Sequence, residues 1–176
     1  MEKGLIIIYY GNGKGKTTAS LGLALRAIGY NLRVCMIQFI KGEWKYGEIH
    51  SSNLLKPHFE LIIAGKGFVG ILDDDHDINE HIQASRNALS LAKEKINSLS
   101  YDTVILDEIN YALRLKLIEE SDVLSMLRTK PPQVNVILTG NYITEEMLEI
   151  ADLVTEMKEI KHPYKKKIKA KKGIDF

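Results

Sequence analysis

The chain has 176 residues, a length typical of one compact domain, and its 24 basic and 23 acidic residues nearly balance. A near-neutral protein has no global field that draws it to nucleic acid or to a membrane surface. No apolar stretch approaches the length that spans a bilayer, and the single Cys35 excludes an internal disulfide and a cysteine cage for zinc. With no signal peptide expected before the first strand, we predict a cytoplasmic protein with one domain over residues 1–176.

Short apolar runs alternate with segments of helical periodicity along the chain. The predicted strands are rich in Val, Ile and Leu, as expected for strands covered on both faces, and lie at residues 5–9, 33–39, 61–64, 103–106, 134–139 and 153–156. The first predicted helix ends at Ile28, and the other predicted helices lie at residues 80–97, 121–127 and 144–150. This order predicts an α/β fold of the P-loop NTPase-like (RecA-like) type, with helices on both faces of a mostly parallel sheet.

A glycine-rich turn follows the first predicted strand and has the sequence Gly-Asn-Gly-Lys-Gly-Lys-Thr at residues 11–17. Strand, glycine-rich turn, Lys-Thr pair and helix in this order are the context of a phosphate-binding P-loop. Glycines let consecutive backbone N–H groups point at an anion, and the helix N-terminus adds partial positive charge. Lys16 supplies a charge for the distal phosphates, and the Thr17 hydroxyl can bind Mg²⁺. The sequence therefore predicts nucleotide binding.

The P-loop is one residue shorter than the common form, because Tyr10 stands where the usual pattern has its first glycine. A shorter loop wraps different phosphates. Ordinary phosphoryl transfer to an acceptor is therefore not assumed.

Two carboxylates follow an apolar run, where Val104-Ile105-Leu106 leads into Asp107 and Glu108. An acid at the carboxyl end of a strand is typical of a Walker B segment, which meets the metal of the P-loop. Because side chains alternate faces along a strand, only one of the two is expected to face the metal. We assign that role to Glu108 and a structural role to Asp107.

Two aromatic residues lie in predicted loops at the same edge of the sheet, Trp44 after the second strand and Phe68 in a glycine-rich loop. Together they suggest a flat apolar second substrate, although an aromatic covering the core also explains Trp44. Arg26, nine residues beyond Thr17, either reaches the phosphates or lies on a solvated helix face. The lysine-rich tail from about residue 158 is most simply a solvated charge run.

The combination of these blocks resembles the P-loop ATP:cob(I)alamin (corrinoid) adenosyltransferases of bacterial cobalamin biosynthesis and salvage. The resemblance covers essentially the whole chain. The blocks that carry it are residues 11–18, Gln-Phe-Ile-Lys-Gly at 38–42, Leu-Asp-Glu at 106–108, Leu-Thr-Gly at 138–140, Ala-Asp-Leu-Val-Thr-Glu-Met at 151–157 and Lys-His-Pro at 161–163.

The resemblance implies that reduced cobalt of the corrinoid attacks the 5′ carbon of ATP, which is bound in reverse orientation, and that the triphosphate leaves. It implies catalytic roles for Lys16, Thr17 and Glu108, and a Mg²⁺ or Mn²⁺ ion held by Thr17 and Glu108. Phe68 matches an aromatic that lies against the corrinoid, and we place Trp44 beside it. A homodimer and an electron-donating reductase are the implied partners, and neither a membrane nor nucleic acid is expected. The predicted ATP-binding residues are Gly11, Asn12, Gly13, Lys14, Gly15, Lys16, Thr17, Thr18 and Arg26.

Three positions depart from residues that family members carry: Gly70 stands where some members have a second aromatic, Asn141 where an arginine is frequent, and Lys167 where a glycine is common. Two other functions remain open at this point. One is a small P-loop ATPase or nucleoside kinase. The other is a nucleic-acid-dependent ATP switch that uses the lysine-rich tail, which the near-neutral charge disfavours.

Overall fold

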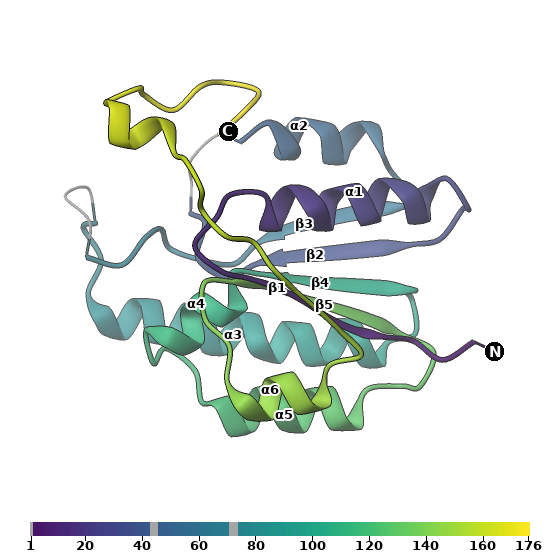
Figure 1. Cartoon of the computed structure of the whole chain (residues 1–176). Coiled ribbons are helices and arrows are strands. Elements are labelled where there is room, and N and C mark those ends of the chain that lie inside the picture. Colours follow the sequence, from purple (N-terminus) through teal and green to yellow (C-terminus); the bar gives the residue numbers. More distant parts are fainter. Residues whose placement is uncertain (1, 43–45, 71–73) are drawn as a thin grey trace.

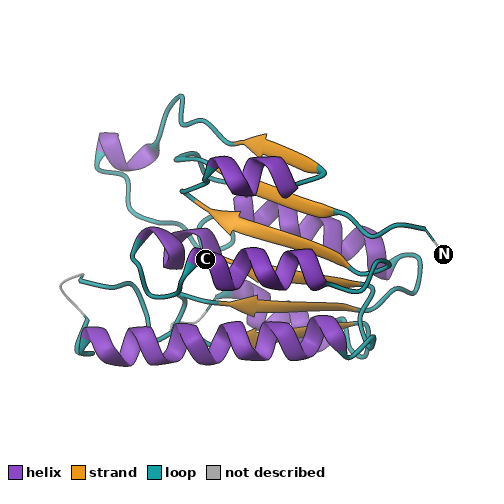
Figure 2. Ribbon diagram, turned by 90° about the horizontal axis from the view of Figure 1, so that it is seen from below, coloured by secondary structure: helices purple, strands orange, loops and turns teal. Residues whose placement is uncertain are grey.

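The computed structural model describes residues 2–42, 46–70 and 74–176. In this part of the chain six strands form one sheet in the order β3-β2-β4-β5-β1-β6, and every pairing is parallel. The strand arrows accordingly run in the same direction in Figure 2. The strands are β1 (Ile6–Tyr10), β2 (Val34–Gln38), β3 (Phe59–Ile63), β4 (Thr103–Asp107), β5 (Asn135–Gly140) and β6 (Leu153–Glu156).

Helices cover both faces of the sheet, with α1 and α2 on one face and α3 to α6 on the other (Figure 1). A short 3-10 helix, Pro163–Lys166, lies in the tail. The helices are α1 (Lys16–Ile28), α2 (Gly47–Leu54), α3 (Ile78–Asn97), α4 (Ile109–Arg114), α5 (Glu120–Thr129) and α6 (Glu145–Ile150). None of the helices among the described residues is long and apolar enough to cross a membrane.

Alternating residues of each strand enter two separate cores. In β2, Val34 and Met36 pack with Ala24 of α1, whereas Cys35 and Ile37 join the larger core that includes α3 and α5. Every residue of β2 is buried. Burial on both faces explains why these strands appear in the sequence as continuous apolar runs without polar alternation.

The predicted α/β fold is confirmed, and the strand boundaries differ from the predicted ones by at most two residues. Two of the α-helices in the described part of the chain were not predicted. Helix α2 buries a single serine, Ser52, so it lacks the apolar stripe that marks a helix in sequence. Helix α4 has six residues and is separated from β4 by Glu108 alone, which leaves no room for a turn signal between the two elements.

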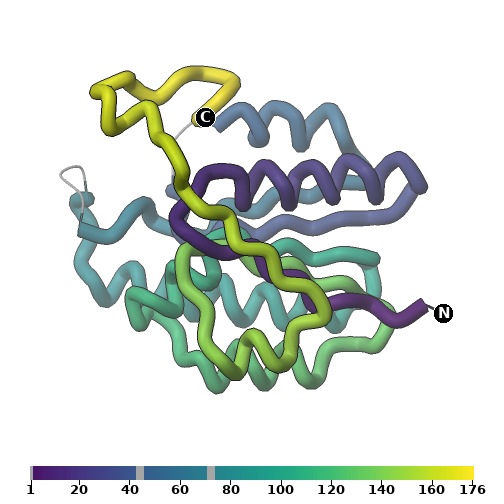
Figure 3. The backbone as a smooth tube through the Cα atoms, in the orientation of Figure 1, coloured from purple at the N-terminus to yellow at the C-terminus, as the bar shows by residue number. Residues whose placement is uncertain are grey.

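The topology brings the predicted motifs to one edge of the sheet. Because all six strands are parallel, the loops that follow β1, β2, β3, β4 and β5 meet at their carboxyl ends. Strands β4 and β5 lie between β1 and β2, so α1 crosses over them. The tail then folds back over the start of α1 (Figure 3), where the Gly13 N–H donates to the Met157 carbonyl at 2.6 Å.

Candidate active site

The loop between β1 and α1 is shaped as an anion cradle. Gly11 and Gly15 have φ angles of 109° and 111°, in the left-handed region that favours glycine. Gly15 precedes α1 without a side-chain cap, so the first N–H groups of this 13-residue helix remain available to an anion. Lys16 Nζ donates to the carbonyls of Gly11 and Gly13, both at 2.8 Å, which holds the ammonium over the loop. Burial lowers the pKa of Lys16, while Glu108 and Asp107 oppose that shift.

The carboxylate of Asp107 at the end of β4 is fully buried and positions Thr17. Its Oδ1 accepts hydrogen bonds from the hydroxyls of Thr17 and Thr139, both at 2.8 Å. Its Oδ2 accepts a bond from Gln38 Nε2 at 3.3 Å. The sequence predicted a structural role for Asp107, yet this is the carboxylate that contacts the P-loop threonine.

Glu108 lies outside β4, which ends at Asp107, and its backbone conformation differs from that of a strand. Its φ of 63° is left-handed, and its backbone N–H donates to Thr139 Oγ1 at 2.8 Å. The alternation of faces along a strand therefore does not apply to this pair, and both carboxylates lie at the site. Burial, and then the charge of Asp107, raise the pKa of Glu108 to about 7 against the opposing effect of Lys16.

The oxygen donors at this point fit a hard divalent cation such as Mg²⁺ or Mn²⁺. Thr17 Oγ1 and the carboxylates of Asp107 and Glu108 are the ligand types that Mg²⁺ accepts. Gln38 Oε1, on the residue that contacts Asp107, is a buried acceptor without a donor in the described part of the chain, as a metal-bound water would supply. The described part of the chain contains no group of three or more His, Cys, Asp or Glu that could hold a metal. An Mg²⁺ ion usually keeps several water ligands and binds substrate phosphates beside one or two carboxylates, which fits these donors.

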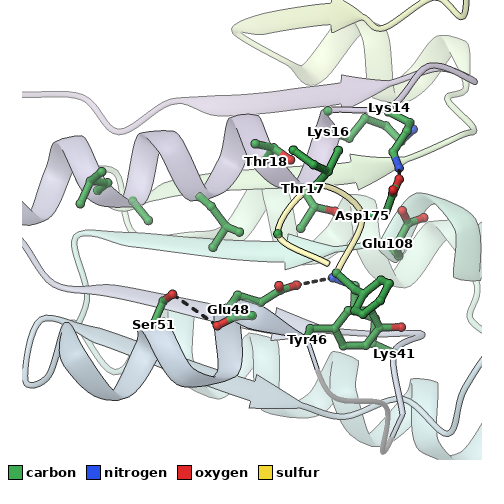
Figure 4. Close-up of a pocket in the computed structure, with 18 of the residues that line it drawn as sticks. Lys14, Lys16, Thr17, Thr18, Lys41, Tyr46, Glu48, Ser51, Glu108 and Asp175 are labelled. Atoms are coloured by element: carbon green, nitrogen blue, oxygen red, sulfur yellow. Dashed lines mark hydrogen bonds and ion pairs between the residues drawn. The ribbon is translucent and has the colours of Figure 1, made fainter. Parts of the chain in front are cut away.

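A cavity of about 970 Å³ opens beside the P-loop (Figure 4). The P-loop residues, Thr18 among them, form one wall, and Lys41, Tyr46 and Glu48 form another. A smaller cavity of about 280 Å³ adjoins it and is lined by Gly11, Asn12, Lys16, Phe68, Glu108, Tyr111 and Asn141. Phe68 lines both cavities, and its ring centroid lies 6.5 Å from that of Tyr111. An aromatic ring thus faces the same space as the phosphate loop.

One predicted site residue, Arg26, is not brought into this arrangement, and the position of another is not described. Arg26 is exposed in the last turn of α1 and is not among the residues that line either cavity. Trp44 lies outside the described residues. Lys41 and Glu48, in turn, were not predicted as site residues. Lys41 carried a signal, since it belongs to the Gln-Phe-Ile-Lys-Gly block, whereas no sequence signal marked Glu48.

The loop that carries Phe68 is tied to α3 by Asp74. The Asp74 carboxylate accepts the backbone N–H of Gly70 at 2.7 Å and contacts Nε2 of His81 at 2.9 Å. His81 is only 3% exposed. Asp74 therefore fastens the Phe68 loop to a buried histidine.

The raised pKa of Glu108 predicts a pH-dependent stability in the metal-free protein. The folded chain keeps this proton to a pH of about 7, whereas the unfolded chain loses it near 4.5, so the free energy of unfolding falls as pH rises between these values. Glu108→Gln removes this contribution. We expect the variant to gain stability relative to the wild type between about pH 4.5 and about pH 8 in urea denaturation with a chelator. A parallel pH dependence in both proteins would contradict the raised pKa.

The tail places a carboxylate on the P-loop, because Asp175 forms an ion pair with Lys14 and lines the larger cavity. This carboxylate neutralises Lys14 and repels phosphate. We expect Asp175→Asn to tighten ATP binding, measured by calorimetry, by up to about fivefold, as befits a partly exposed pair. Glu159→Gln is the matched control, since it breaks the pair with Lys165 elsewhere in the tail. Weaker ATP binding by Asp175→Asn would show instead that the tail supports the nucleotide.

The fold and this site define a P-loop nucleotide-binding protein. Two solved structures share the fold at 15% identity, and each covers 89% of this chain. The flagellar accessory protein FlaH of Methanocaldococcus jannaschii has a TM-score of 0.60 over 72% of its length, and a KaiC-like protein of Pyrococcus horikoshii has 0.51 over 74%.

Residues 2–176 match the family model described as ATP:corrinoid adenosyltransferase BtuR/CobO/CobP. The corrinoid adenosyltransferase of Escherichia coli K12 is 39% identical over 99% of this chain and 87% of its own length. The corrinoid adenosyltransferase CobA of Salmonella typhimurium is 36% identical with the same coverage. That of a Sinorhizobium species is 39% identical over 99% of this chain and 81% of its own. The chain belongs to the corrinoid adenosyltransferase family.

Proposed function

We propose that this protein transfers the 5′-deoxyadenosyl group of ATP to the reduced cobalt of a corrinoid and releases triphosphate. The observation that carries the proposal is the shared space at the carboxyl edge of the sheet, where the phosphate loop and the ring of Phe68 line the same cavities. A phosphate cradle serves the nucleotide, and an aromatic ring serves a flat apolar partner. The family match over the whole chain supports both substrates.

The proposed reaction forms a cobalt–carbon bond to the 5′ carbon and breaks the carbon–oxygen bond to the triphosphate, which leaves with the bonding pair. Since the nucleophile belongs to the corrinoid, the protein contributes alignment and stabilisation of charge on the departing group. Lys16 and the N–H groups at the start of α1 hold the phosphates. Thr17, Asp107 and Glu108 would hold Mg²⁺ or Mn²⁺, which neutralises negative charge on the triphosphate when bound.

In this proposal ATP is bound in the reverse of the conventional orientation of a nucleotide on a P-loop. Its 5′ carbon is directed to the smaller cavity, and the corrinoid lies against Phe68. Arg26 is retained as a nucleotide contact and Trp44 as a corrinoid contact. A homodimer in the cytoplasm and an electron-donating reductase complete the proposal. Gly70 stands where some family members have a second aromatic, so Phe68 is the aromatic of this loop that would lie against the lower face of the corrinoid.

The proposal is tested by mixing the protein with ATP, Mg²⁺ and chemically reduced cobalamin or cobyrinic acid a,c-diamide. We expect a light-sensitive adenosylated corrinoid and an equal amount of free triphosphate. Release of ADP without a corrinoid product, or only in the presence of nucleosides, would favour a P-loop ATPase or nucleoside kinase. The family match does not favour that alternative.

A further inference from the structure

A second group of charged residues lies on the wall of the larger cavity that faces the phosphate loop. Figure 4 shows Lys41, Tyr46 and Glu48 on one side of the cavity, and Lys16 and Thr17 on the other. Lys41 follows β2, and Glu48 belongs to the first turn of α2. These residues have no role in the function proposed above.

Lys41 is a buried cation held by two acidic residues and an aromatic ring. Its side chain is 12% exposed, and its Nζ donates to Glu48 Oε1 at 2.6 Å. Asp107 Oδ2 lies 3.7 Å from Nζ, and the centroid of the Tyr46 ring lies at 4.5 Å. Burial alone would lower the pKa of Lys41, but Asp107 and Glu48 raise it, so the ammonium stays charged. An unpaired lysine at this depth would be costly, and Glu48 removes that cost.

The Lys41 ammonium retains donors for a ligand. A lysine carries three N–H donors. Among the described residues Nζ makes one hydrogen bond, to Glu48, since the separation from Asp107 exceeds hydrogen-bond range. Of the other two lysines of the cavity, Lys16 donates to two loop carbonyls, and Lys14, which pairs with Asp175, has a side chain that is 47% exposed and is therefore less fixed than Lys41. With respect to the described part of the chain, Lys41 is thus a fixed cation with unused donors at the cavity wall.

The position of Lys41 relative to the phosphate loop follows from Asp107. One oxygen of this carboxylate accepts the Thr17 hydroxyl at 2.8 Å, and the other lies 3.7 Å from Lys41 Nζ. The Thr17 hydroxyl and the Lys41 ammonium therefore lie next to the two oxygens of the same carboxylate. A chain of three linked phosphates bound at Thr17 is long enough to reach both.

We propose that Lys41 binds the triphosphate group, both as part of ATP and as the product after its bond to the 5′ carbon is broken. Glu48 is the positioning residue that holds the Lys41 ammonium for this role. This inference rests on the proposed function. When the bond to the 5′ carbon breaks, the departing oxygen gains a full negative charge, and a fixed cation stabilises it without reorganisation. The triphosphate product is bound through the same contact, so its affinity measures Lys41 directly.

The test is calorimetric titration of inorganic tripolyphosphate, in the presence of Mg²⁺, into Lys41→Met and Lys41→Arg. We expect Lys41→Met to bind tripolyphosphate roughly tenfold or more weakly than the wild type, the effect of one lost charge-assisted hydrogen bond. Lys41→Arg keeps the charge and should restore most of the affinity. Equal affinity in Lys41→Met and the wild type would overturn the proposal.

The positioning role of Glu48 is tested by a double-mutant cycle on kcat, corrected for the folded fraction measured by circular dichroism. We expect Glu48→Gln to lower kcat in the wild type and to cause no further loss in Lys41→Met, because it acts through Lys41. Independent, additive losses would contradict the positioning role.

Lys95→Met is the matched control, since Lys95 forms a partly buried pair with Glu60 at 3.0 Å and lines neither cavity of the site. It should leave tripolyphosphate affinity unchanged, and a loss as large as that of Lys41→Met would overturn the proposal. A failure of the proposed function can be told apart from a failure of this inference. If the proposed function were wrong, the wild type would make no adenosylated corrinoid, and this result does not depend on the tripolyphosphate affinities.

Discussion

Replacing Lys16 by alanine should lower kcat/KM for ATP in corrinoid adenosylation by about 100-fold or more, the usual effect of removing one preorganised charge from a site that stabilises a leaving group. The Lys16 ammonium is held over the loop by the carbonyls of Gly11 and Gly13, and it lines both cavities. Its charge is therefore in place before the substrate arrives. The measurement is the initial rate of adenosylcobalamin formation over a range of ATP concentrations.

Lys14→Ala is the matched control, two residues away in the same loop. The Lys14 side chain is 47% exposed and its charge is already met by Asp175. We expect this variant to lose less than about tenfold in kcat/KM, as is typical of a partly exposed ion pair. Equal losses in the two variants would show that the loop acts through its total charge, which would contradict a specific role of Lys16.

Asp107→Asn should raise the Mg²⁺ concentration needed for half-maximal activity by about 10- to 100-fold, the range seen when a residue that orients or binds a metal is lost. The substitution keeps the shape of the side chain but removes the negative charge of the carboxylate that accepts hydrogen bonds from the hydroxyls of Thr17 and Thr139. Titration of Mg²⁺ at saturating ATP checks this expectation. The free energy of unfolding, measured in parallel, separates metal binding from loss of the fold.

Glu108→Gln is the companion variant, and we expect it to change the Mg²⁺ requirement less than Asp107→Asn does. The Thr17 hydroxyl is hydrogen-bonded to Asp107, and Glu108 has a pKa raised to about 7, which disfavours its charged form. The opposite order of effects would support the sequence prediction, in which Glu108 is the main metal ligand.

The fold was largely predictable because its signals are local. Strands buried on both faces appear as apolar runs, and α3 and α5 carry apolar stripes on one side. Helix α2 escaped prediction because its residues are mostly polar and its position depends on contacts with the rest of the domain, such as the hydrogen bonds of Glu48 to Lys41 and Gln38. Contacts of that kind leave no periodic pattern in the sequence.

Residues 11–17 alone determined the anion cradle, since the glycines, the lysine and the threonine that build it are adjacent in sequence, and the ordered blocks along the chain indicated the family. Only the tertiary structure decided which carboxylate meets Thr17, because Asp107 lies 90 residues away and β4 ends at that residue. The pairing of Lys41 with Glu48 and of Lys14 with Asp175 depends likewise on where parallel strands deliver their loops. Local backbone geometry can be read from neighbouring residues, whereas a contact between distant segments exists only once the sheet has assembled.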